Sequence, residues 1–279
     1  MKTRKILAVI MAMVMLFSVV STSVITASAA DVSYYNVYNL TDRNGVIRAG
    51  HYTSFYSGKI VFYPQEMLEN DETYPVIVWA NGTMCPPVLY YSLLSLIAKS
   101  GYIVIANTNV MSASGEKQIE SIDFILEENA DENSVFYQRV DAENIGAIGH
   151  SQGGRSSVNA AQTDERIDCI MSIAGSNFEK EVENLITPAL FVTGQFDIIV
   201  MSSQWVEPAY ELSQGPAVFA SLYQGIHTSC ILEAEKYSSY AVEWFDAWLK
   251  NDSEAKDTFR DGGAFSADPD WQKFACKGF

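Results

Sequence analysis

The run Gly149-His150-Ser151-Gln152-Gly153 restricts how this 279-residue chain can fold more than any other feature does. It has the pattern G-x-S-x-G. An apolar stretch at residues 144–148 precedes it and predicts a buried strand, while residues 154–161 predict the start of a helix. Strand, sharp turn and helix together predict a nucleophile elbow, which holds the serine out at the end of the strand. The five-residue pattern alone is common, so the interpretation depends on residues further along the chain.

Short apolar segments alternate with helical patterns along most of the chain. This alternation predicts the α/β class, a mostly parallel sheet covered by helices on both faces. A segment at 32–38 that is rich in tyrosine and β-branched residues, and a similar segment at 57–64, predict antiparallel strands at one side of that sheet. The expected parallel strands are 75–79, 102–107, 145–149, 169–174, 189–194 and 217–223, and the expected helices are 89–98, 116–128, 154–162, 202–212 and 237–250.

Residues 31–279 have the length of one α/β domain with a sizeable core. In folds of this kind a lid or cap domain is often inserted between the strand ending at Ala174 and the strand starting at Ala189. The chain between those residues is too short to hold one. We therefore expect no cap or lid domain and a site open to bulky substrates.

The first thirty residues predict a secretory signal peptide. Lys2, Arg4 and Lys5 precede an uncharged apolar run at 6–20, and the small residues Ala27-Ser28-Ala29 follow. An uncleaved membrane anchor is the alternative. No later run is long enough to span a bilayer. We therefore expect a secreted protein without stable membrane insertion.

The charge balance narrows the partners that the chain could bind. It has 18 basic and 34 acidic residues, a formal charge of −16. Such a surface repels nucleic acid and anionic membranes, so neither is an expected partner.

The cysteines and histidines lack the spacing of a zinc site, and no metal or cofactor is expected. Asp261, Asp268 and Asp270 could bind calcium, with solvated turn residues as the alternative. We expect a monomer.

Four cysteines leave the disulfide pattern open. Cys169 lies inside an apolar run and is expected to be a buried thiol. Because exported proteins can keep disulfides, a Cys230–Cys276 bridge is expected, with Cys85–Cys230 as the competing pairing.

Three histidines make the search for a catalytic base short. A serine hydroxyl needs a base within hydrogen-bonding reach, and the base needs an orienting acid. His227, in a loop after the last core strand, is the expected base. His51 is expected to be exposed, and His150 to pack beneath the elbow. Asp197 follows a strand and a glycine turn and is the expected acid.

Glu207 and Asp246 are weaker rivals for the acid because both are expected on helices. The order serine, aspartate, histidine is the order found in α/β-hydrolases.

An oxyanion hole would complete the site. The backbone N–H groups of Gln152 and Thr83 are the expected donors. Asn81-Gly82-Thr83 also matches a glycosylation sequon, which we interpret as a chance match.

The motifs together resemble those of secreted bacterial α/β-hydrolases of the cutinase, polyesterase and chlorophyllase-like group. The similar segments are residues 76–83, 149–154, 194–197 and 225–227, and the tail at 268–271 is similar too. The resemblance implies carboxylic-ester hydrolysis through an acyl-enzyme, with Ser151, Asp197 and His227 as the triad. A secreted serine peptidase and a non-catalytic binding protein on the same fold are the alternatives.

The chain departs from polyester-degrading cutinases at three places. It has Thr83 where they usually carry an aromatic residue, Gln152 where they usually carry methionine, and no tryptophan in the loop at 174–177. An aromatic clamp is therefore not carried over to these positions. Phe178, Trp205 and Tyr223 are candidate replacements, with ordinary core or rim packing as the alternative. The substrate is expected to be an ester, which could be polymeric or bound to a surface.

Overall fold

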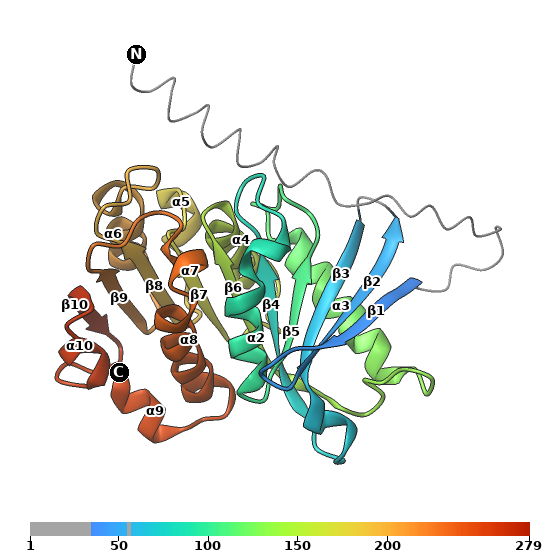
Figure 1. Ribbon diagram of the computed structural model, residues 1–279. Helices are drawn as coiled ribbons and strands as arrows, with labels where there is room; N and C mark the ends of the chain where they lie inside the picture. The colour runs from blue at the N-terminus through green and yellow to red at the C-terminus, as the bar shows by residue number, and fades with distance from the viewer. Residues whose placement is uncertain (1–34, 55–56) are drawn as a thin grey trace. The chain divides into compact units, whose positions relative to one another are not determined.

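The computed structural model describes residues 35–54 and 57–279 (Figure 1). The signal peptide expected at 1–30 lies outside the described residues. So does the first part of the strand expected at 32–38.

The described strands form one ten-stranded sheet in the order β1-β2-β3-β5-β4-β6-β7-β8-β9-β10. The six strands from β5 to β9 in this order run parallel, while β1, β2 and β3 at one side and β10 at the other are antiparallel to their neighbours. The strands are β1 (Tyr35–Thr41), β2 (Val46–Ser54), β3 (Ser57–Pro64), β4 (Tyr74–Ala80), β5 (Ile103–Asn107), β6 (Val140–His150), β7 (Cys169–Ile173), β8 (Ala189–Gly194), β9 (Ala217–Leu222) and β10 (Trp271–Lys277).

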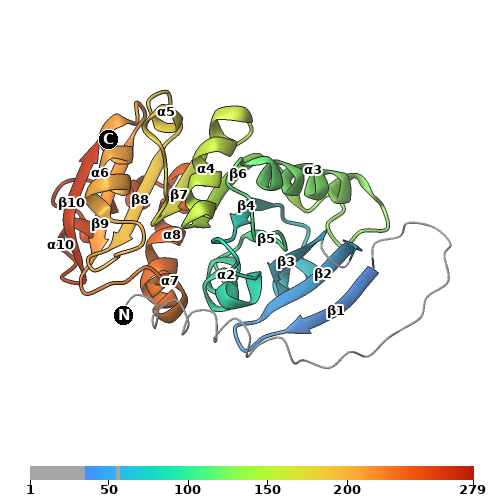
Figure 2. The same cartoon turned by 90° about the horizontal axis from the view of Figure 1, so that it is seen from above.

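Helices cover both faces of the sheet (Figure 2). One face carries α3 (Glu116–Ala130), α4 (Gln152–Thr163), α5 (Glu179–Val182) and α6 (Ser202–Leu212), and the other carries α2 (Tyr91–Lys99), α7 (Ser229–Leu232), α8 (Ala234–Leu249), α9 (Ser253–Thr258) and α10 (Ala264–Ala267). Two 3-10 turns, η1 (Gln65–Leu68) and η2 (Pro87–Tyr90), lie in the connections after β3 and β4.

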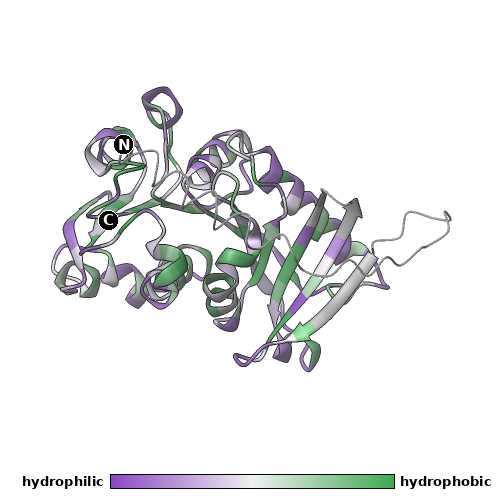
Figure 3. Ribbon diagram, turned by 45° about the horizontal axis from the view of Figure 1, so that its top comes forward, coloured by the Kyte–Doolittle hydropathy of each residue, from purple (hydrophilic) through white to green (hydrophobic). Residues whose placement is uncertain are grey.

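The side chains of each central strand alternate between two hydrophobic cores. On β4, Ile77 and Trp79 pack into the core beneath α2 and α8, whereas Val76 and Val78 pack into the core beneath α3 and α4. A parallel strand buried on both faces has to be apolar at successive positions, which is why these segments are continuous apolar runs in the sequence. Figure 3 shows the central strands coloured as hydrophobic.

The α/β prediction is confirmed, and several element bounds agree closely. The ranges expected for α6 and β8 are those observed. Two antiparallel strands were not predicted from the sequence: β2, which is next to one edge of the sheet, and β10, which forms the other edge. His51 lies on β2 and is buried, so the expectation that it is exposed was wrong. Its ring packs edge-on against Phe124 of α3, with ring centroids 5.2 Å apart.

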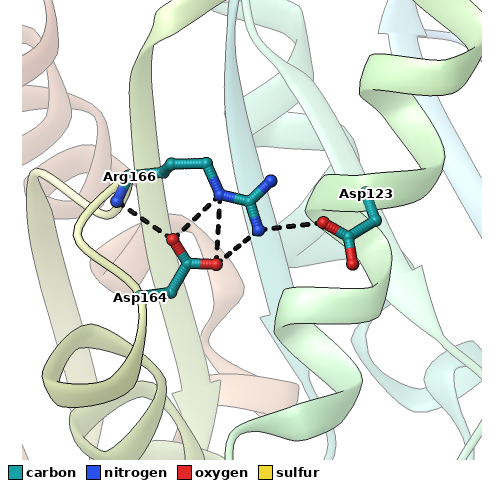
Figure 4. A network of polar contacts seen from close by, with 3 residues as sticks. All are labelled: Asp123, Asp164 and Arg166. Atoms are coloured by element: carbon teal, nitrogen blue, oxygen red, sulfur yellow. Dashed lines mark hydrogen bonds and ion pairs between the residues drawn. The ribbon is translucent and has the colours of Figure 1, made fainter.

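A cluster of charged groups ties α3 to the turn between α4 and β7 (Figure 4). Arg166 donates from Nε to Asp164 Oδ1 over 2.9 Å and from Nη2 to Asp123 Oδ1 over 2.9 Å. The hydrogen bonds from the Arg166 side chain lower the pKa of Asp164. This network fixes the chain just before β7, the strand that follows the elbow helix.

The four cysteines are free thiols, so the predicted Cys230–Cys276 bridge is wrong. Cys276 lies on the edge strand β10, opposite Val218 of β9, whereas Cys230 is buried in α7. Burial and the neighbouring Cys85 thiol raise the pKa of Cys230. Cys85, which belonged to the competing pairing, is also free, and Cys169 is buried as expected.

No helix among residues 35–54 and 57–279 combines the length and the apolar character needed to cross a membrane.

Candidate active site

Ser151 lies in a strained turn between β6 and α4. Its backbone has φ 58° and ψ −122°, a conformation that L-residues rarely adopt outside functional sites. The glycines beside it explain how the turn closes. A Cβ atom on Gly149 would lie 2.2 Å from the Gly153 carbonyl oxygen, and one on Gly153 would lie 2.0 Å from the Ala80 oxygen. The predicted elbow therefore forms, and only glycine fits at either position.

Asp197 and His227 meet although they come from different loops. Asp197 Oδ2 lies 2.7 Å from His227 Nδ1, and the Asp197 side chain is fully buried. Asp197 Oδ1 accepts hydrogen bonds from the backbone N–H groups of Ile199 and Val200, at 2.9 and 2.8 Å. One oxygen thus anchors the carboxylate to its own loop, and the other orients the imidazole of His227.

His150 places Ser151 at the same edge of the sheet as His227. The His150 and His227 rings are tilted against each other with centroids 4.6 Å apart, and His150 Nε2 lies 2.7 Å from the His227 carbonyl oxygen. Because Ser151 follows His150 directly, the elbow and the histidine loop are in contact. Burial and the nearby His227 lower the pKa of His150 to about 3, so this ring is neutral.

The loop after β4 presents Thr83 as an exposed residue. The N–H groups on either side of it are engaged: Gly82 donates to Tyr90 Oη over 3.3 Å, and Met84 donates to the Val110 oxygen over 3.0 Å. The Thr83 N–H is thus a candidate oxyanion donor between two anchored neighbours.

Asn81, by contrast, is fully buried, and its side-chain nitrogen donates to the Asn107 and Asn109 oxygens. This burial agrees with the interpretation of the sequon as a chance match.

Gln152 is the first residue of α4, so its N–H is among those that a helix leaves without an internal partner. Its side chain points elsewhere and donates to the Val110 oxygen over 2.9 Å. Val110 also accepts from Met84, so one carbonyl links the elbow to the loop after β4. Sequence patterns give no sign of this anchoring role because it depends on a tertiary contact.

Two of the three candidate substrate contacts lie together. The rings of Phe178 and Trp205 are 5.6 Å apart, and the Arg155 guanidinium lies 4.2 Å from the Phe178 ring centroid. Phe178 and Trp205, together with Asn177 and Gln204, line a surface pocket after β7. Tyr223 is exposed on a different loop, after β9.

Two of the three aspartates considered for calcium binding, Asp268 and Asp270, make contacts within the protein. Asp268 accepts from Tyr240 Oη over 2.6 Å, and Asp270 forms an ion pair with Lys236 at 3.0 Å. Across the described residues, no group of three or more His, Cys, Asp or Glu side chains could hold a metal ion. The rivals Glu207 and Asp246 lie on α6 and α8 as expected.

The doubly covered, mostly parallel sheet, with a serine elbow at the carboxyl end of β6 and a buried aspartate–histidine pair at the same edge, defines an α/β-hydrolase. A family model described as PET hydrolase-like matches residues 15–265. The chain belongs to that family.

Characterised relatives are distant. The chain is 22% identical to a bis(hydroxyethyl) terephthalate hydrolase of Streptomyces coelicolor over 71% of its length and 64% of the relative's. It is 23% identical to cutinase est1 of Thermobifida alba over 71% of its length and 67% of the relative's. It is also 23% identical to lipase 1 of a Moraxella species over 56% of its length and half of the relative's. The chain thus spans about two thirds of the first two relatives and half of the third.

Proposed function

We propose that this protein is a secreted serine hydrolase that cleaves carboxylic esters through an acyl-enzyme. The observation that carries the proposal is the 2.7 Å contact between His227 Nδ1 and Asp197 Oδ2 beside a strained serine elbow. That contact holds the imidazole with Nε2 available as a base, which is the form that a serine nucleophile requires. The names of the relatives, a terephthalate-ester hydrolase, cutinases and a lipase, support esters as the substrate class.

In the proposed reaction, His227 takes the proton from Ser151 as its oxygen attacks the ester carbonyl. The N–H groups of Thr83 and Gln152 donate to the developing oxyanion, each contributing roughly 3 kcal/mol to lowering the barrier. His227 then protonates the leaving alcohol. Water, deprotonated by His227, attacks the acyl-enzyme and releases the acid. Asp197 holds the tautomer of His227 throughout.

Exposed apolar side chains around this edge support an apolar or polymeric ester as the substrate. They follow the carboxyl ends of five parallel strands, which meet at one edge of the sheet. They are Met84, Met111, Phe178, Phe196, Ile198, Tyr223 and Ile226. The connection between β7 and β8 contains only the short helix α5, so no cap inserted there covers them.

Substitution of the nucleophile tests the proposal. Ser151→Ala should abolish hydrolysis of p-nitrophenyl butyrate, and a fluorophosphonate probe should label the wild-type protein but not this variant. A peptide substrate assayed in parallel separates an esterase from a peptidase. Retention of most esterase activity by Ser151→Ala contradicts the proposal, and an unlabelled wild-type protein identifies a non-catalytic binding protein.

A further inference from the structure

Two buried side chains beside the proposed site have no role in the proposed reaction. They are Tyr90, the last residue of η2, and His150, the last residue of β6, and both are essentially inaccessible to solvent. Aromatic residues in a core are usually there for packing. These two also form a continuous chain of hydrogen bonds.

The direction of each hydrogen bond in this chain follows from its chemistry. His150 Nε2 lies 2.7 Å from the His227 carbonyl oxygen, which can only accept, so Nε2 carries the proton. Because burial keeps the ring neutral, Nδ1 has a lone pair and accepts from Tyr90 Oη at 2.9 Å. Tyr90 Oη in turn accepts from the Gly82 N–H at 3.3 Å. One arrangement of protons is therefore consistent with all three hydrogen bonds.

The two ends of this hydrogen-bond chain lie in the two loops that must be aligned around Ser151. Gly82 precedes Thr83 in the proposed oxyanion loop, and the other end is the backbone of His227. We propose that Tyr90 and His150 are positioning residues for catalysis: they form a relay that sets the oxyanion loop and the His227 loop relative to the elbow. This inference rests on the proposed function, because it assigns roles around the same triad.

The backbone of Gly82 lies directly against the relay. A Cβ atom there would be 2.9 Å from Tyr90 Oη and 3.0 Å from His150 Nδ1. The loop therefore approaches the relay as closely as a glycine allows, and its position depends on both side chains. Small shifts matter at such a site, since misplacing a catalytic group by about 1 Å can lower the rate roughly 100-fold.

A pair of tyrosine substitutions separates positioning from packing. Tyr90→Phe removes one buried hydroxyl of the relay. Tyr102→Phe removes another buried hydroxyl, which donates to Asp246 of α8 over 2.5 Å on the same face of the sheet. At a temperature where both variants are folded by circular dichroism, we expect Tyr90→Phe to lower kcat for p-nitrophenyl butyrate at least 10-fold with KM within twofold. We expect Tyr102→Phe to keep kcat within twofold of wild type.

The rate at which a p-nitrophenyl phosphonate modifies Ser151 should fall with kcat in Tyr90→Phe, because that reaction needs the same base and oxyanion donors. Equal kcat values in Tyr90→Phe and Tyr102→Phe would overturn the relay.

Substitutions of His150 provide a second test that does not depend on Tyr90. In His150→Gln, an amide N–H can still reach the His227 carbonyl, whereas His150→Leu fills similar space without a donor. We expect kcat of the leucine variant to fall about 100-fold and the glutamine variant to recover at least 10-fold of that loss. Equal kcat values for the two variants contradict the inference.

Failure of the proposed function itself has a different signature, because Ser151→Ala would then hydrolyse esters as well as the wild type. If Ser151→Ala is inactive while Tyr90→Phe and His150→Leu are fully active, only the relay is wrong.

Discussion

Asp197 Oδ2 lies 2.7 Å from His227 Nδ1, and the remaining oxygen of this carboxylate is held by two backbone N–H groups of its own loop. The carboxylate therefore cannot turn away from the histidine without breaking those two bonds. An aspartate fixed in this way sets both the tautomer and the direction of the imidazole ring.

Replacing Asp197 by asparagine should lower kcat by roughly 10³- to 10⁴-fold, because the amide would present a donor to His227 Nδ1 and favour the wrong tautomer. Steady-state hydrolysis of p-nitrophenyl butyrate measures the effect. Glu207→Gln is the matched control, since Glu207 binds Ser202 and Lys273 at the surface of α6. If Glu207→Gln lost as much activity as Asp197→Asn, the acid would have been assigned to the wrong residue.

Phe178→Ala should raise KM for a long-chain or aromatic ester by roughly 5- to 10-fold while leaving hydrolysis of p-nitrophenyl acetate nearly unchanged. The ring is 48% exposed, and an apolar substrate that covers it gains the corresponding burial. Ile186→Ala is the control, because Ile186 is 75% exposed but lies just before β8, at the amino ends of the parallel strands. Equal effects of the two variants on KM would exclude Phe178 as a substrate contact.

The buried, neutral His150 should make folding stability depend on pH. Its pKa is about 3 in the folded protein and 6.5 in the unfolded chain. Below pH 6.5 the unfolded chain binds a proton that the folded protein does not, so stability falls as the pH falls. Between pH 7 and pH 5 the wild type should lose about 2 kcal/mol more free energy of unfolding than His150→Gln.

Urea unfolding at both pH values measures this change in the free energy of unfolding for each protein. His51, whose pKa burial also lowers, is present in both proteins and cancels. If the free energy of unfolding changed equally between pH 7 and pH 5 in the wild type and in His150→Gln, His150 would not titrate in this way.

The Asp164–Arg166 pair predicts a further loss of stability on acidification, at lower pH than the loss expected from His150. Hydrogen bonds from Arg166 hold the pKa of Asp164 below 3.8 in the folded protein. The stability it contributes is present above pH 3.8 and is lost as the pH falls through the folded pKa. Asp164→Asn should therefore destabilise the protein by roughly 1 kcal/mol at pH 7 and by less at pH 3.

Urea unfolding of the wild type and the variant at both pH values checks this expectation. Asp71→Asn is the control, because the Asp71 side chain that contacts Arg139 is fully exposed and should matter little at either pH. A cost of Asp164→Asn that is the same at pH 7 and pH 3 would contradict the lowered pKa.

Elements with a strong local pattern could be predicted from the sequence. The elbow, β8 and α6 have strong periodicity and turn residues, and each lies where the pattern predicts. Strand β10 could not be predicted, because its sequence alternates poorly where a lysine and a register shift interrupt its pairing with β9.

Tertiary relationships leave no such local pattern. Nothing in the spacing of Cys230 and Cys276 reveals that one lies in α7 and the other on the edge strand. The burial of His51 depends on α3 covering β2. The hydrogen bond between Tyr90 and His150 joins residues 60 positions apart, so no local signal could have identified it.

The positive φ of Ser151 has a consequence for how the protein responds to heat. A backbone held in that region reverts to an ordinary conformation once the surrounding packing loosens, even while helices and strands persist. Hydrolytic competence should then disappear at a lower temperature than the far-ultraviolet circular dichroism signal. Residual enzymatic activity would therefore detect thermal loss of the native fold earlier than any measurement of its secondary structure.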